Sequence, residues 1–217
     1  MRARNALMIH GGWEGHEPEA CVKRFVEPLE SAGFTVTLTD TLAILDEPEF
    51  LAAQDLIVPC WTMGELTPSQ EANLLRVVEA GAGLAGWHGG MGDAFRGSPA
   101  YQYMAGGQFV AHPGNITRYT VKIARSEDPI VAGLRDFAMH SEQYYLHVDP
   151  GNEILATTVF SGDVHPWIGG VEMPVVWKRR YGAGRVFYSA LGHTATDFDT
   201  PEVFTLTTRG LLWAARD

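Results

Sequence analysis

Short apolar runs alternate with segments of helical periodicity in the N-terminal part of the chain, and this alternation restricts the fold more than any other feature. The runs are residues 6–10, 34–39, 55–59 and one that begins at residue 83. One helical face between the first two runs carries Val22, Phe25, Val26 and Leu29. This is the i, i+3, i+4, i+7 spacing of an amphipathic helix. A β-α-β order of this kind favours parallel strands and right-handed crossovers, so the chain is predicted to be α/β.

Two local signals refine the helices of this region. Thr67-Pro68-Ser69-Gln70 has the pattern of a capping box with proline in the first helical turn. Pro28 lies inside the first helix. It is predicted to kink that helix or end it early, because proline lacks the backbone N–H that the helix needs.

The remainder of the chain lacks this regular alternation. Residues 91–114 are rich in glycine, proline and aromatic residues, and they are predicted to form a long, functional loop. Strands are predicted over residues 119–124, 140–146 and 154–160, then a hairpin over residues 174–191 and a final helix from residue 201. The sequence shows no internal repeat and no linker, so residues 1–217 are predicted to form a single domain.

Charge and cysteine content exclude several functional classes. A net charge of −10 argues against a nucleic-acid partner or an anionic membrane. No apolar run approaches the length that spans a bilayer. Two cysteines, Cys21 and Cys60, do not make a disulfide framework, and Cys60 is predicted to be a buried structural thiol. We therefore expect a cytoplasmic protein with reduced thiols.

The stretch Gly86-Trp87-His88-Gly89-Gly90 marks a candidate functional site. Its Gly-x-His-x-Gly spacing matches the strand-to-helix elbow that carries a serine or cysteine nucleophile in several α/β enzymes. Here the residue at the apex is His88.

Three histidines, His10, His88 and His193, lie at or just past the predicted ends of strands. Ligands of open α/β sheets bind outside the carboxyl ends of the strands, so these side chains are expected to converge on one crevice. Histidine can serve there as acid, base or metal ligand. The alternative is that each is an ordinary, partly buried histidine, but the glycine beside each of them favours close approach of a ligand.

A metal site is one use of these histidines. No two histidines of the chain have the His-x-x-x-His spacing of a local metal motif. Histidines from separate strand ends can nevertheless bind a divalent metal such as zinc, with a water in the open position, and His10, His88 and His193 are the candidates. The Gly11-Gly12 and Gly89-Gly90 pairs match neither dinucleotide nor P-loop patterns, so no nucleotide is expected.

Four motifs together resemble the ThuA-like, or trehalose-utilisation, family. They are residues 86–90, residues 106–113 (Gly-Gly-Gln-Phe-Val-Ala-His-Pro), residues 140–145 (His-Ser-Glu-Gln-Tyr-Tyr) and residues 174–193. That family is similar in fold to class I glutamine amidotransferases. The resemblance therefore implies a three-layer, flavodoxin-like sandwich with a mostly parallel sheet and a C-terminal antiparallel hairpin, and it supports an elbow at His88.

The chain departs from the amidotransferase pattern at two positions. His88 stands where those enzymes carry cysteine, and Ala195 stands where a glutamate follows the triad histidine, here His193. An imidazole cannot form the thioester intermediate, and the triad histidine loses its orienting acid. Glutamine hydrolysis is therefore not expected.

Glu142 is the carboxylate candidate. It alternates with His140 and Tyr144 on a predicted strand, so the three side chains are expected to share one face. A solvated edge face is the alternative. If the face lines the crevice, a glutamate and a histidine can perform the proton transfers of sugar chemistry.

The resemblance implies a sugar or keto-sugar substrate, handled by a hydrolase, isomerase or hydratase. His88, His193 and Glu142 are the predicted catalytic residues. The predicted substrate-binding residues are His10, His16, Trp61, His112, His140 and Tyr144. A non-catalytic sugar-binding or regulatory module on a retired amidotransferase scaffold is the alternative function. The expected partner is a small sugar, with no nucleic acid and no membrane, while assembly into a homo-oligomer stays open.

Overall fold

The computed structural model describes residues 4–217, so residues 1–3 of the predicted domain lie outside the described part. The strands are β1 (Arg4–Gly12), β2 (Phe34–Thr39), β3 (Leu56–Thr62), β4 (Gly83–Trp87), β5 (Gly107–Ala111), β6 (Ile116–Ile123), β7 (Phe137–Glu142), β8 (Tyr145–Val148), β9 (Glu153–Val159), β10 (Glu172–Tyr181) and β11 (Gly184–Ser189). The helices are α1 (Pro18–Lys23), α2 (Val26–Ser31), α3 (Pro48–Ala52), α4 (Pro68–Glu79), α5 (His88–Gly92), α6 (Pro99–Ala105) and α7 (Pro201–Ala214). Short 3-10 helices are η1 (Glu14–His16), η2 (Leu42–Asp46), η3 (Pro166–Ile168) and η4 (Ala195–Asp199).

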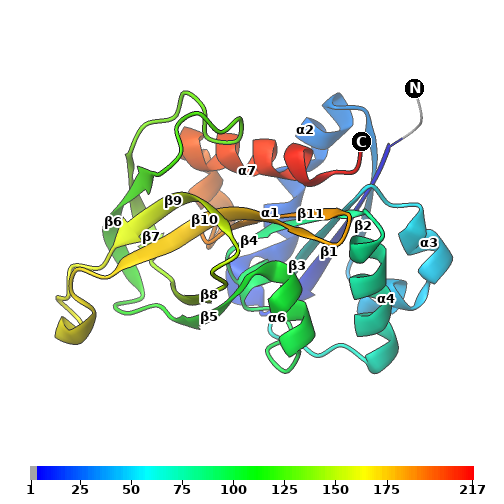
Figure 1. Ribbon diagram of the computed structural model, residues 1–217, viewed down its shortest axis with the longest axis horizontal. Helices are drawn as coiled ribbons and strands as arrows, with labels where there is room; N and C mark the ends of the chain where they lie inside the picture. Colours follow the sequence, from blue (N-terminus) through cyan, green and yellow to red (C-terminus); the bar gives the residue numbers. More distant parts are fainter. Residues whose placement is uncertain (1–3) are drawn as a thin grey trace.

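The larger sheet has the strand order β2-β1-β3-β4-β11-β10-β9-β6-β7 (Figure 1). Its first five strands are parallel, in the order 2-1-3-4-5 of flavodoxin-like folds. Their central residues are apolar without alternation, as in the buried run Ala6–Ile9 of β1. Strands covered by helices on both faces read this way, so the predicted α/β fold is confirmed.

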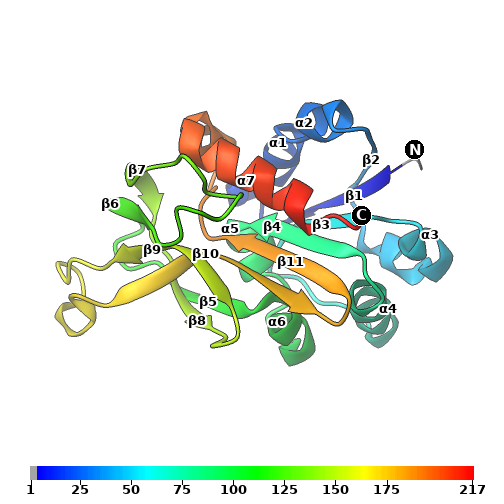
Figure 2. The same ribbon diagram turned by 45° about the horizontal axis from the view of Figure 1, so that its top comes forward.

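Helices cover both faces of the parallel strands and complete three layers. Figures 1 and 2 show α1, α2 and α7 over one face, and α3, α4 and α6 over the other. The capping box predicted at the start of α4 is present, because Thr67 and Gln70 exchange side-chain and backbone hydrogen bonds. Among the helices of residues 4–217, none is both long and apolar enough to cross a membrane.

The predicted C-terminal hairpin is also confirmed and extends the sheet. β10 and β11 pair antiparallel, and β9, β6 and β7 continue the sheet with antiparallel neighbours. A separate two-stranded sheet joins β5 and β8. The antiparallel extension places the end of β7 beside the ends of the parallel strands, which is where the candidate site lies.

Two expectations for the middle of the chain were wrong. Residues 91–114 contain α6 and β5 as well as loops. Ser98 caps α6, Pro99 occupies its first turn, and Gly106 ends it in the left-handed region. The strand predicted over residues 140–146 is divided into β7 and β8, because β7 pairs with β6 and β8 pairs with β5. The predicted effect of Pro28 is confirmed: the helix is divided into α1 and α2.

Candidate functional site

His88 occupies the apex of a strand-to-helix elbow, as the glycine spacing predicted. It follows β4, begins α5 and has a φ of 43°. This left-handed conformation is strained for a residue with a side chain, and such strain is common at functional sites. The turn needs small neighbours: a Cβ on Gly90 would lie 2.8 Å from Cα of Cys60. The elbow therefore holds the imidazole in a fixed place at the end of the sheet.

Hydrogen bonds define the tautomer of His88. Its Nδ1 lies 2.8 Å from the carbonyl oxygen of Ala190, and its ring stacks on Tyr144 with centroids 3.9 Å apart. Since a carbonyl oxygen only accepts, Nδ1 donates and Nε2 carries the lone pair in the neutral ring. Burial lowers the pKa of His88 to about 4, although the neighbouring carboxylate of Glu142 opposes this shift. The ring is thus neutral near pH 7.

His193 approaches His88 from the loop after β11. Its Nδ1 lies 3.3 Å from Oε2 of Glu142 and 3.3 Å from Nε2 of His88. Asp197 in η4 fixes this loop, because its Oδ2 accepts hydrogen bonds from the backbone N–H of His193 and from the hydroxyl of Ser141. Burial alone would lower the pKa of His193, but the hydrogen bond and charge of Glu142 raise it.

His16 enters the same place from η1, the short helix that follows β1. Its Nδ1 lies 2.6 Å from Oγ1 of Thr62, and its Nε2 lies 3.9 Å from Oε2 of Glu142. The side chain is only 6% exposed.

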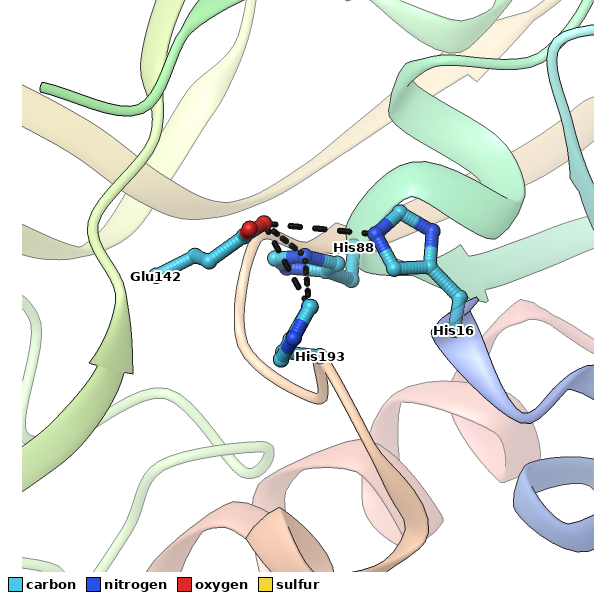
Figure 3. A group of neighbouring side chains, drawn as sticks. All are labelled: His16, His88, Glu142 and His193. Carbon is cyan, nitrogen blue, oxygen red and sulfur yellow. Dashed lines mark hydrogen bonds and ion pairs between the residues drawn. The ribbon is translucent and has the colours of Figure 1, made fainter. Parts of the chain in front are cut away.

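One oxygen of Glu142 is shared by all three histidines (Figure 3). Glu142 ends β7 and is 7% exposed, and its Oε2 lies 3.1 Å from Nε2 of His88. Burial would raise the pKa of this carboxyl, but the neighbouring rings of His16, His193 and His88 lower it far below its usual range. We refer to His16, His88, Glu142 and His193 as the His-Glu cluster; their ligating atoms all lie within 4.8 Å of one another.

The cluster also explains the departure at Ala195. The glutamate that the amidotransferase pattern places after the triad histidine is absent from that position. Glu142, which comes from the antiparallel part of the sheet, supplies a carboxylate to His193 instead. The carboxylate beside His193 therefore comes from a residue that lies far away in the sequence.

A pocket of about 200 Å³ opens beside the cluster. It is lined by Trp13, His16, Thr62, Met63, Asp93, Arg96, Phe109, His112, Glu142 and Tyr144. Asp93 is buried and accepts two hydrogen bonds, at 2.6 and 2.7 Å, from the guanidinium of Arg96. Nε2 of His112 lies 3.9 Å from the other carboxylate oxygen of Glu142, Oε1. The pocket thus combines aromatic faces, one cation and the second oxygen of the glutamate.

The structure brings together most of the residues predicted from the sequence. His88, His193 and Glu142 form the cluster, while His112 and Tyr144 line the adjoining pocket. His16, predicted only as a substrate-binding residue, belongs to the cluster itself.

Three predicted site residues lie elsewhere. β1 continues past His10 to Gly12, so His10 lines a separate pocket together with Trp61 and is not part of the His-Glu cluster. His140 alternates with the buried residues of β7 and is exposed. The convergence expected of His10, His88 and His193 therefore holds for the last two, and His16 takes the place expected for His10.

Sequence reasoning missed several pocket residues: Trp13, Thr62, Met63, Asp93, Arg96 and Phe109. Thr62 directly ends β3, a parallel strand, and strand ends were the signal used for the histidines. Asp93 and Arg96 are spaced three residues apart just after the elbow, a spacing that allows an ion pair. Trp13 and Phe109 carry no local signal of this kind.

Comparisons with known proteins agree with this fold. The family model described as ThuA, trehalose utilisation, matches residues 5–214. A ThuA-like protein of Bacteroides uniformis ATCC 8492 is similar in structure, with a TM-score of 0.81, 19% identity, and coverage of 98% of this chain and 91% of that one. A cytoplasmic protein of Salmonella typhimurium LT2 has a TM-score of 0.67 and 13% identity, covering 98% of this chain and 100% of that one.

A more distant likeness is to part of a β-galactosidase from Bacillus circulans sp. alkalophilus. Its TM-score is 0.59 at 16% identity, covering 94% of this chain and 30% of that one. At these identities the structural comparisons show a shared fold. A comparison with curated proteins gives no match.

Proposed function

Because the chain belongs to the ThuA (trehalose utilisation) family, we propose that it is an enzyme of carbohydrate catabolism that acts on a sugar or keto-sugar. Its substrate is trehalose, a related disaccharide or an oxidised form of one. The reaction is a hydrolysis, isomerisation or hydration, carried by acid/base or metal-assisted chemistry at the His-Glu cluster. The expected location is the cytoplasm, where Cys21 and Cys60 stay reduced.

The observation that carries this proposal is the convergence of an ionised glutamate and three histidines beside a pocket. Withdrawing a charged carboxylate from water disfavours folding unless partners compensate for it. A packed core has no need for such a group, whereas strongly shifted titratable side chains gather where proton transfer takes place. Glu142, His88 and His193 have this character.

The pocket suits one sugar ring. Its volume of about 200 Å³ is below the roughly 300 Å³ at which pockets for drug-sized ligands begin. Trp13, Phe109 and Tyr144 offer aromatic faces, and Arg96 offers donors to hydroxyl or carbonyl oxygens. Burial raises the pKa of Tyr144 well above its usual range, so its hydroxyl stays protonated and can donate. We propose that the pocket holds the ring at which reaction occurs.

Proton transfer at a keto-sugar needs a base for a C–H or O–H and a donor for the carbonyl or leaving oxygen. His193 is the proposed base, since its Nδ1 lies 3.3 Å from Oε2 of Glu142 and the hydrogen bond and charge of that carboxylate raise the pKa of His193. His112 and Tyr144 are the pocket-lining donors. Glu142 is the supporting carboxylate, which orients His88 and His193 and stabilises positive charge that develops on them.

Glutamine hydrolysis does not fit this site. His88 stands at the apex of the elbow in place of a cysteine, and both cysteines of the chain are buried. Burial raises the pKa of Cys21 to about 12 and that of Cys60 well above its usual value. Neither thiol is a nucleophile under ordinary conditions.

A non-catalytic sugar-binding module is the second candidate. It is favoured by the absence of the elbow cysteine and of a glutamate after His193. Both functions use the same pocket, so turnover has to be measured together with binding.

The test compares the wild-type protein with Glu142→Gln, which keeps the size and shape of the side chain. Trehalose and its keto forms are supplied, and product formation and binding are measured for each protein. The enzyme proposal expects a loss of turnover of roughly 100- to 10,000-fold with binding retained. His147→Ala, which changes an exposed histidine on β8, is the control and should behave as wild type. Binding without turnover in the wild type supports the module instead.

A further inference from the structure

We propose that the His-Glu cluster is the binding site of one divalent transition-metal cation of the zinc class. The ligands are Nε2 of His16, Nε2 of His88, Oε2 of Glu142 and Nδ1 of His193 (Figure 3). Metal binding is inferred from the geometry alone, whereas a role of the metal in catalysis rests on the proposed function.

Three of the four atoms have the spacing of a metal coordination shell, and the atom of His16 lies slightly farther away. Oε2 of Glu142 lies 3.1 Å from Nε2 of His88, 3.3 Å from Nδ1 of His193 and 3.9 Å from Nε2 of His16. The two ring nitrogens of His88 and His193 are 3.3 Å apart. Tetrahedral zinc with bonds of about 2.0 Å holds its ligand atoms roughly 3.3 Å from one another.

The hydrogen-bond pattern also favours a positive charge between these atoms. Because Nδ1 of His88 donates to the carbonyl oxygen of Ala190, Nε2 is the ring nitrogen that directs its lone pair at Oε2 of Glu142 when the ring is neutral. Two acceptors thus face each other at 3.1 Å. A cation bound by both atoms removes this repulsion.

The outer partners match those of metal-binding histidines, which normally donate their second ring N–H to a neighbour. Ala190 accepts from His88, and Thr62 lies 2.6 Å from Nδ1 of His16, which directs Nε2 of that ring toward the cluster. His193 is fixed through its backbone by Asp197. Three of the four ligands are therefore oriented before any metal arrives.

The donor set selects the class of metal. Three imidazole nitrogens and one carboxylate oxygen suit zinc, iron, nickel or copper, whereas magnesium and calcium prefer oxygen ligands throughout. His16 is the most distant ligand from Glu142, and it lines the pocket together with that residue. A substrate oxygen can reach the cluster from this side, and a metal held there would polarise it as a Lewis acid.

The experiment measures zinc binding to the full-length protein after chelator treatment, by calorimetric titration with Zn²⁺ alone. The wild type is expected to bind one Zn²⁺ per chain. Glu142→Gln and His16→Gln, which keep side-chain size, should each weaken binding roughly 100-fold. His147→Ala should bind as wild type, and circular dichroism checks that every variant is folded.

Absence of binding by the folded wild type, tested also with Co²⁺, Ni²⁺ and Fe²⁺, would overturn the metal site. Equal affinity in wild type and both glutamine variants would overturn it as well. Turnover assayed on the same samples separates the two proposals. A metal-free protein with full turnover contradicts only the catalytic role of the metal, and zinc binding without turnover on any sugar contradicts only the enzyme.

Discussion

The ring orientations of two cluster histidines, His16 and His88, each depend on a single neighbouring oxygen. Thr62 lies 2.6 Å from Nδ1 of His16, and the carbonyl of Ala190 lies 2.8 Å from Nδ1 of His88. Such partners decide which ring nitrogen carries the lone pair. They are as necessary to the site as the residues that meet in its centre.

Thr62→Val tests this dependence at His16. Valine has nearly the shape of threonine but offers no oxygen, so we expect the affinity for Zn²⁺ to fall 10- to 100-fold, by roughly the amount seen when such outer partners are removed elsewhere. Calorimetric titration with Zn²⁺ measures the change. Thr207→Val is the matched control, because the buried hydroxyl of Thr207 has no hydrogen-bond partner within residues 4–217. An unchanged affinity in Thr62→Val would contradict the role of this hydroxyl.

A second prediction at the level of single residues concerns the reactivity of the Cys21 and Cys60 thiols. A raised pKa means fewer thiolates, and the thiolate is the reactive form. With the pKa of Cys21 at about 12, roughly one thiol in 10,000 is ionised at pH 8. We expect neither Cys21 nor Cys60 to react with a thiol reagent in the native protein, and both to react in guanidinium chloride. Rapid modification of either thiol in the native state would contradict their burial.

Among the elements, the elbow between β4 and α5 depends most strongly on its residue types. Its turn brings α5 against β3, so that a Cβ on Gly90 would lie 2.8 Å from Cα of Cys60. Backbone atoms cannot move aside as a flexible side chain does. The elbow therefore tolerates no side chain at this position without a shift of β3.

Gly90→Ala is expected to destabilise the protein by about 1–3 kcal/mol, the usual range for overpacking. Gly97→Ala is the matched control, because a Cβ there meets nothing within 4 Å and its φ is not in the left-handed region. Its effect should stay within about 0.5 kcal/mol. Urea denaturation measures both. Equal stability of the two variants would show that the elbow is not tightly packed.

The elements differ in how far the sequence predicted them. Parallel strands and the hairpin are visible because apolar runs and glycine turns are local signals. β7 and β8 could not be separated in this way, since the break at residues 143–144 depends on pairing with β6 and β5. α6 carried its own start and end signals at Ser98, Pro99 and Gly106, so it could have been predicted.

In the whole molecule, the site exists because two kinds of sheet meet. β1, β4 and β11 deliver His16, His88 and His193 at their carboxyl ends, and the antiparallel extension delivers Glu142 from the opposite side. The strand-end rule found His88 and His193 because it concerns local sequence. It could not exclude His10 or select His16, because that choice depends on where β1 ends and how η1 turns.

A bound metal should stabilise the entire fold, since its ligands come from segments distant in the sequence. At 100 times the dissociation constant, a ligand that binds only the native state adds about 2.7 kcal/mol. For a chain of this length, that raises Tm by roughly 5–11 °C. Scanning calorimetry with and without Zn²⁺ measures the shift. Glu142→Gln should show little of it, and an equal shift in both proteins would indicate binding elsewhere.

X-ray diffraction at the zinc absorption edge, from crystals of the protein grown with Zn²⁺, locates the cation directly. The expected result is one anomalous peak within about 2.0–2.2 Å of Nε2 of His16, Nε2 of His88, Oε2 of Glu142 and Nδ1 of His193. The absence of a peak among these four atoms, at full zinc saturation in solution, would contradict the site.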